Sequence, residues 1–172
     1  DAGYRKAMNR FSAELLLATL GNEGSLMVSP ASVYLALAMT LNGADGETKA
    51  AMLDVLADKG LTLEMINQAS RDWMTLLQKT GPKTSLTIAN SIWFDQFFAP
   101  YKPFLQGNAD FFGADARKLD FKDPATIDTI NRWVEAATKG TIDSIIDQIH
   151  PDAVLYLINA IYFKSDWQVP FE

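Results

Sequence analysis

Apolar residues recur at spacings of three and four along much of the chain, which is the spacing of one face of an α-helix. In the first such stretch Tyr4, Phe11 and Leu15 fall on one face, and Gly21 follows where a helix can end. The pattern as a whole predicts six helices. They are expected over residues 2–20, 30–41, 47–56, 62–79, 104–112 and 124–137.

Two of these helices carry a clear start signal, a capping side chain followed by proline. In Ser29-Pro30 and Asp123-Pro124 the side-chain oxygen can accept from a free backbone amide, and proline at the first helical position loses no hydrogen bond. The helix over 30–41 is apolar on nearly every side, which is typical of a buried helix. In the helix over 47–56 the residues expected to face inward are Met52, Leu53, Val55 and Leu56.

Four segments have the pattern of β-strands. Residues 86–94 alternate in character, residues 115–120 form a short extended segment, and residues 25–28 form a short apolar one. Residues 153–163 are apolar or aromatic apart from Asn159, and this lack of alternation predicts a strand buried on both faces. The run is shorter than the roughly 20 apolar residues of a membrane span. Runs of helices with separated strands predict an α+β protein.

Three polar side chains lie in surroundings where polar groups are unusual. Asn is disfavoured in strands and a buried amide costs free energy unless it is hydrogen-bonded, so Asn159 is expected to have a partner. Ser29 and Ser32 lie at the start of the buried helix. If that helix packs under the strand, the three side chains form one buried polar network, which would specify a unique arrangement. The simpler roles remain open, a helix cap for Ser29 and a satisfied buried amide for Asn159.

Composition narrows the classes of function. The 172 residues, 48% hydrophobic and 21% charged, are typical of a folded globular domain. A net charge of −6 argues against nucleic acid and against anionic membrane surfaces as partners, because both call for basic patches. The sequence has no cysteine, which excludes disulfides, thiolate nucleophiles and cysteine-based zinc sites.

The common catalytic signatures are missing from the sequence. It has no phosphate-binding loop, no dinucleotide-binding glycine motif, no His-Glu-x-x-His and no Gly-x-Ser-x-Gly. The single histidine, His150, stands beside Pro151 and is expected in a loop. Acidic pairs such as Asp143 and Asp147 lack the ligand spacing of a cation loop and are expected on the solvated surface. The four tryptophans, Trp73, Trp93, Trp133 and Trp167, are expected in the core. We therefore predict no enzyme, no metal and no cofactor.

Several motifs, in their order and spacing, resemble the N-terminal half of a serpin over nearly the whole chain. They are VSPAS at 28–32, NGADGET at 42–48, ANSIWF at 89–94, NRWVE and TKG at 131–135 and 138–140, and NAIYFK at 159–164 followed by Trp167 and Phe171. Each motif alone is modest, and together they are specific. One residue departs from the pattern, since many members of the family have glycine where Ser165 stands here.

The resemblance implies a fold. It is the region of helices A to F, three strands (2, 1 and 3) of the main sheet A, and one strand of sheet B, the segment over 25–28. Residues 1–172 are then expected to be the N-terminal portion of a single domain whose C-terminal half, with the reactive loop, is absent.

The resemblance also implies roles for individual residues. Ser29, Ser32 and Asn159 match the shutter, where sheet A parts. Trp167 matches the breach, where the loop first enters, and Lys164 and Phe171 match the exit of the third strand. Asn131 and Trp133 match the helix that the inserting loop must pass.

The function implied by the resemblance is suicide inhibition of a serine or cysteine protease. The protease cleaves the reactive loop and is trapped as an acyl-enzyme, and the loop then inserts into sheet A as a new strand. The expected partners are the target protease and either the C-terminal half of the same protein or a second copy, and the expected location is extracellular or at the cell surface. The alternatives are a non-inhibitory serpin acting as a binding or chaperone protein, and an unrelated α+β ligand-binding domain or enzyme.

Overall fold

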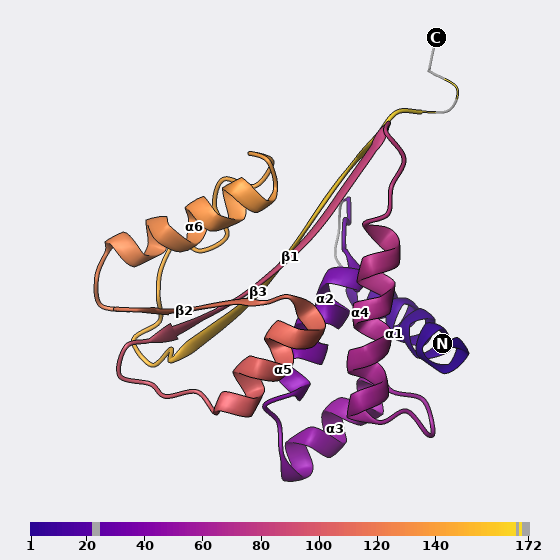
Figure 1. Ribbon diagram of the computed structural model, residues 1–172, viewed down its shortest axis with the longest axis horizontal. Coiled ribbons are helices and arrows are strands. Elements are labelled where there is room, and N and C mark those ends of the chain that lie inside the picture. Colours follow the sequence, from indigo (N-terminus) through magenta and orange to yellow (C-terminus); the bar gives the residue numbers. More distant parts are fainter. Residues whose placement is uncertain (22–24, 168, 170–172) are drawn as a thin grey trace. The chain divides into compact units, whose positions relative to one another are not determined.

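The computed structural model describes residues 1–21, 25–167 and 169 (Figure 1). These residues form two compact units. The first contains Asp1–Arg71 and Tyr101–Phe112, and the second contains Asp72–Pro100 and Gly113–Glu172. The prediction of a single domain over 1–172 stays a prediction.

The six predicted helices are all present among the described residues. They are α1 (Ala2–Thr19), α2 (Pro30–Leu41), α3 (Gly46–Leu56), α4 (Leu63–Leu77), α5 (Lys102–Phe112) and α6 (Ala125–Ala137). The cap predicted for α2 is confirmed, since the Ser29 hydroxyl oxygen accepts from the backbone amide of Ser32 at 3.3 Å. Asp1 caps α1 in the same manner, accepting from the amides of Gly3 and Tyr4 at 2.7 and 3.1 Å.

The first unit is built around three aromatic rings on α1 and α2. Tyr34 is fully buried and meets Tyr4 and Phe11 edge to face, with ring centroids 5.5 and 5.4 Å apart. The Tyr34 hydroxyl donates to the backbone carbonyl of Leu56 at 2.9 Å, which ties α2 to the end of α3. Arg10 of α1 donates to three carbonyl oxygens at that same end, those of Asp54, Val55 and Ala57, and so satisfies acceptors that have no partner within the helix.

A close approach fixes α5 within this unit. A Cβ built on Gly43 would lie 2.9 Å from the Phe104 ring, a distance that real Cβ atoms essentially never show. Glycine is therefore required where the turn after α2 meets α5.

The second unit contains a three-stranded sheet in the order β2–β1–β3. The strands are β1 (Thr84–Asp95), β2 (Asp115–Leu119) and β3 (Leu155–Ser165). β1 pairs in parallel with β2 and antiparallel with β3, where Phe94 lies opposite Leu155 and Thr84 opposite Ser165. These are the three strands expected of sheet A.

Helix α6 lies along one face of this sheet (Figure 1). Trp93 of β1 and Ile158 of β3 pack there against Ile130 and Val134 of α6, and all four side chains are buried. Because side chains alternate along a strand, Asn90 and Asn159 lie on the opposite face.

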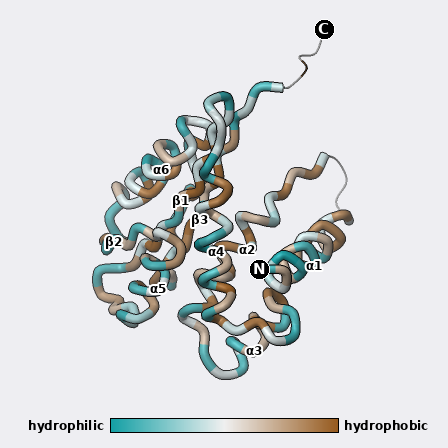
Figure 2. Tube along the Cα trace, turned by 45° about the vertical axis from the view of Figure 1, so that its right-hand side comes forward, coloured by the Kyte–Doolittle hydropathy of each residue, from teal (hydrophilic) through white to brown (hydrophobic). Residues whose placement is uncertain are grey.

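The strand predicted over 25–28 is not formed. Residues 25–29 have no regular structure, Met27 is 98% exposed and Leu26 is 43% exposed. Figure 2 shows the hydrophobic colour of this segment on its way to α2. A strand needs a hydrogen-bonded neighbour, and among the described residues no strand pairs with this one. The predicted sheet-B strand is therefore absent from the described structure.

Three predictions of burial were also wrong. Of the residues expected to face inward from α3, only Leu56 is buried, and Val55 is 45% exposed. β3 is not buried on both faces, because only Ile158 and Ala160 are buried and Phe163 is 64% exposed. Trp167, expected in the core, is 71% exposed. Trp93 is fully buried, as predicted, whereas Trp73 and Trp133 are half-buried.

Candidate functional site

The partner predicted for Asn159 is Asn90. The two residues lie directly opposite each other in the antiparallel pair of β1 and β3. The Asn159 amide nitrogen donates to the side-chain oxygen of Asn90 at 2.7 Å, and the Asn90 amide nitrogen lies 3.8 Å from the sulfur of Met74 on α4. Asn90 is 3% exposed and Asn159 is half-buried, so this amide pair lies partly within the core and favours the observed register.

Ser29 and Ser32 belong to the first unit, whereas Asn159 belongs to the second. Ser29 is exposed and caps α2, and Ser32 is half-buried in the first turn of that helix. The network that would join these hydroxyls to Asn159 stays a prediction.

Asn131 fastens the segment that follows α6 onto that helix. Its side-chain oxygen accepts from the backbone amides of Ile145 and Ile146 at 2.9 and 3.1 Å, and its amide nitrogen donates to the carbonyl of Ile146 at 2.8 Å. The side chain of Asn131 thus pairs with the backbone of the following segment as another strand would, by both donating and accepting hydrogen bonds. It holds Ile146 beside the cluster of Trp93 and Ile158.

Trp133 fastens α6 to the sheet. Its ring meets that of Trp93 edge to face, with centroids 6.0 Å apart and planes at 81°. The buried indole N–H of Trp93 donates to the Ser91 hydroxyl at 2.8 Å, so the ring that receives Trp133 is itself held in place. Asn131 and Trp133 therefore both stabilise the position of α6.

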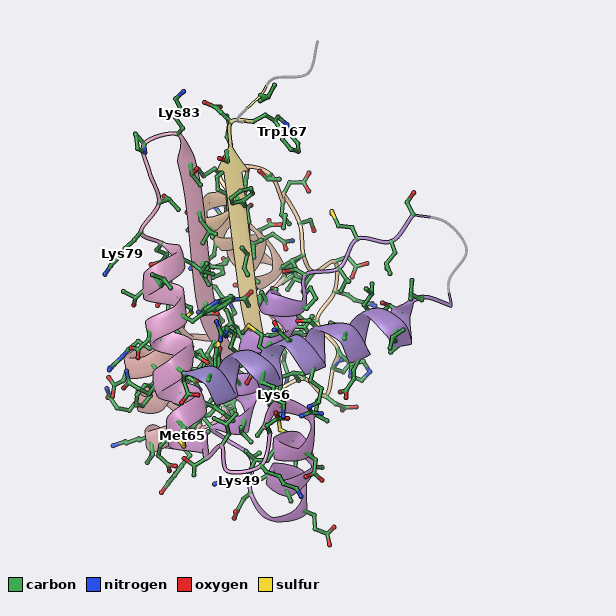
Figure 3. The ribbon with its side chains drawn as sticks, turned by 90° about the vertical axis from the view of Figure 1, so that its right-hand side faces the viewer. Lys6, Lys49, Met65, Lys79, Lys83 and Trp167 are labelled. Atoms are coloured by element: carbon green, nitrogen blue, oxygen red, sulfur yellow. The ribbon has the colours of Figure 1, made fainter. Side chains whose placement is uncertain are left out.

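A polar cluster closes the far end of the β1–β3 pair. The hydroxyls of Thr84 and Ser165 are hydrogen-bonded at 2.7 Å, and Lys164 lies opposite Ser85 in the register. Trp167 follows β3 and lies with Lys83 at this end of the strands (Figure 3). Phe171, also predicted here, lies outside the described residues.

Sequence reasoning did not identify two residues of these contacts as partners. Asn90 was visible as the only side-chain amide within the strand over 86–94, and a search for a polar residue to pair with Asn159 could have found it. Lys139 gave no such signal, since its contacts with Ser85 and Tyr162 depend on where α6 ends.

Hydrogen bonds lower the pKa of two carboxyl groups in the described structure, and burial raises the pKa of two tyrosines. The backbone amide of Phe97, followed by that of Phe121, lowers the pKa of Asp95 at the end of β1. A hydrogen bond from Lys6, aided by Arg10, lowers the pKa of Asp58. Burial raises the pKa of Tyr4 to about 12 and raises that of Tyr34 further.

The single histidine and the acidic side chains form no metal-binding arrangement in the described part of the chain. His150 lies in a loop as predicted, with its ring nitrogen 3.8 Å from a carboxylate oxygen of Asp152 and most of its surface exposed. Among the described residues, no group of three or more histidine or acidic side chains could hold a metal ion. No helix within residues 1–21 and 25–167 is both long and apolar enough to cross a membrane.

Comparison with known proteins places this arrangement in a family. The family described as "Serpin (serine protease inhibitor)" matches residues 6–172. Iripin-2 of Ixodes ricinus is 32% identical over 99% of this chain and 45% of its own length. Corticosteroid-binding globulin of Saimiri sciureus is 30% identical over 94% of this chain and 41% of its own length.

Solved structures agree with the sequence comparison. The thermophilic serpin tengpin in its latent state has a TM-score of 0.94 and 42% identity, over 100% of this chain and 46% of tengpin. Its native state has a TM-score of 0.87 and 43% identity, over 98% and 43%. The chain thus spans a little under half the length of the relatives that it matches.

Proposed function

The chain belongs to the serpin family, and on that premise we propose that it is the N-terminal part of a protease inhibitor that acts by cleavage of a reactive loop, covalent trapping of the protease and insertion of the loop into the sheet. The family match over residues 6–172 supports this proposal. The reactive loop and the residues that choose the protease would lie in the C-terminal part.

One observation carries the mechanism, the position of β3 at the edge of the sheet. β3 pairs with β1 on one side, and on its other side no strand among the described residues pairs with it. It offers 11 residues, Leu155–Ser165, whose backbone groups on that side can receive a further strand. In the proposed mechanism the cleaved loop, or a strand that parts to admit it, is added next to this edge.

The site residues fit this mechanism in distinct roles. Asn159, with Asn90, would hold the middle of β3 at the shutter, assisted by Ser29 and Ser32. Trp167 would stand where the loop enters, and Lys164 and Phe171 would shape the exit of β3. Asn131 and Trp133 would hold α6 in place as the loop passes.

The test is covalent capture of a protease. The full-length protein is incubated with a panel of serine and cysteine proteases and analysed by denaturing electrophoresis. An inhibitory serpin gives a stable 1:1 complex, because an ester or thioester to the loop survives denaturation. A protease whose nucleophile is replaced by alanine must give no complex. Cleavage of the protein without a complex for every protease would reject the proposal.

A second function, a non-inhibitory binding protein, is favoured by one relative. Corticosteroid-binding globulin is 30% identical to this chain, and its name assigns it a small-molecule ligand. Cleavage of the reactive loop separates the two functions. An inhibitor gains strongly in melting temperature once the loop has become a strand, whereas a binding protein that cannot insert its loop does not.

A further inference from the structure

Lys139, two residues beyond the end of α6, has an unusual backbone. Its φ is 52°, and it is the only residue other than glycine with a positive φ in the described structure. A left-handed conformation is unfavourable for a long side chain and persists where surrounding contacts hold it. The next residue, Gly140, also has a positive φ, 78°, which glycine adopts without steric cost.

The side chain of Lys139 contacts two neighbouring strands of the sheet, β1 and β3. Its ammonium nitrogen donates to the Ser85 hydroxyl of β1 at 2.8 Å and lies 4.9 Å from the centre of the Tyr162 ring of β3. The first contact is a charge-assisted hydrogen bond and the second is a cation–π interaction. One side chain therefore bridges β1 and β3 at the C-terminal end of α6.

This bridge lies where α6 ends and the segment that leads back to β3 begins. From Lys139 the chain must return along the sheet to reach Leu155, which pairs with Phe94 at the opposite end of the strands. On the way, Ile145 and Ile146 are bound by Asn131. The return segment, residues 140–154, is thus fixed at its start by Lys139 and in its middle by Asn131.

We propose that Lys139 is a positioning residue that latches the end of α6 and the start of the return segment onto the β1–β3 pair. It controls how readily α6 and the return segment move away from the sheet. Resting on the proposed function, the latch also controls how fast a strand is added beside β3, because the return segment leads directly into that strand.

The test is hydrogen exchange followed by mass spectrometry on the full-length native protein. Three hydrogen bonds report the state of the junction, those donated by the backbone amides of Thr138, Gly140 and Ile142. In Lys139→Asn these amides should exchange about threefold to tenfold faster, the loss expected from one exposed cation–π contact and one hydrogen bond. Because asparagine tolerates a left-handed backbone better than lysine, backbone strain cannot cause such a loss.

Two further variants give controls. Lys139→Arg keeps the charge, the donor and the ring contact, and should restore slow exchange. Lys118→Met removes a charge from β2 of the same sheet at an exposed position, and should leave the three amides unchanged. If Lys139→Asn exchanges like the wild type, or if arginine fails to rescue it, the latch is rejected.

The link to strand addition has its own measurement. After cleavage of the reactive loop, the gain of heat resistance is sampled over time, and Lys139→Asn should gain it faster than the wild type by the factor seen in exchange. Faster exchange with an unchanged gain would overturn this link and leave the latch intact. A wild type that never gains heat resistance would contradict the proposed function, whereas the exchange result stands without it.

Discussion

The side-chain amides of Asn90 and Asn159 face each other across β1 and β3 at 2.7 Å. An amide in an apolar strand demands a partner, and the sequence predicted that much for Asn159. Its partner lies 69 positions away, and only the pairing of the two strands brings it opposite. Residue chemistry was thus predictable, whereas strand register was not.

Asn159→Ala should lower the free energy of unfolding of the full-length protein by about 1–3 kcal/mol, because the buried Asn90 oxygen loses a donor. It should also raise the fraction of polymer, since β3 is then held less firmly. Chemical denaturation and size-exclusion chromatography measure the two effects. A melting temperature and monomer fraction equal to those of the wild type would remove Asn159 from the shutter.

A double-mutant cycle with Asn90→Ala isolates the pair. If the two amides stabilise the sheet mainly through each other, the double variant should lose about 0.5–3 kcal/mol less than the sum of the single losses. Losses that simply add would show that each amide acts through other neighbours.

Burial raises the pKa of Tyr4 to about 12, above its unfolded value near 10, so the fold favours the neutral phenol. This contribution to stability is complete below pH 10 and is lost as the pH rises from 10 towards 12. In Tyr4→Phe the fall in unfolding free energy over this interval should be shallower by up to about 1.4 kcal/mol per pH unit. Urea denaturation at several pH values between 9 and 11.5 tests this, and identical slopes would contradict it.

At the scale of elements, the helices were more predictable than the faces they bury. Spacing located all six helices and the Ser29 cap located the start of α2, because these are local properties of the chain. The N-cap predicted at Asp123 is wrong, since Pro124 is the N-cap of α6 and this position has no side-chain cap hydrogen bond. The strand predicted over 25–28 and the burial predicted for residues of α3 were wrong, because both depend on what packs against these segments. β3 illustrates the same limit, since an apolar run predicts burial only where something covers each face.

Gly43→Ala should destabilise the first unit by about 1–3 kcal/mol, because the added methyl would meet the Phe104 ring and push α5 away from the turn after α2. Gly81→Ala is the matched control, since a Cβ at Gly81 has no neighbour within 4 Å. Thermal unfolding of both variants tests the contact. Equal melting temperatures would show that α5 can move away from the added methyl group without loss of stability.

At the scale of the whole molecule, the exposed edge of β3 predicts association. The backbone groups on the side of β3 where no described strand pairs, beside apolar side chains such as Phe163, 64% exposed, form a template for another strand. The isolated chain of 172 residues should therefore form oligomers or bind a complementary polypeptide. Native mass spectrometry and light scattering measure this directly.

Phe163→Lys should reduce this association, because a lysine near the edge disfavours pairing with a second copy. The substitution Phe97→Lys is the control, since Phe97 is similarly exposed but lies outside the strands. A folded, monodisperse monomer of the unmodified chain would contradict the expectation.

The edge contact between Trp93 and Trp133 has an optical consequence. Two indole rings 6.0 Å apart and nearly perpendicular couple their electronic transitions, and one ring belongs to the sheet while the other belongs to α6. Any movement of α6 off the sheet separates them, so the circular dichroism signal of the coupled rings and the emission of the buried Trp93 should change together. The two tryptophans thus report whether α6 remains in contact with the sheet, and no dye or label has to be attached to the protein.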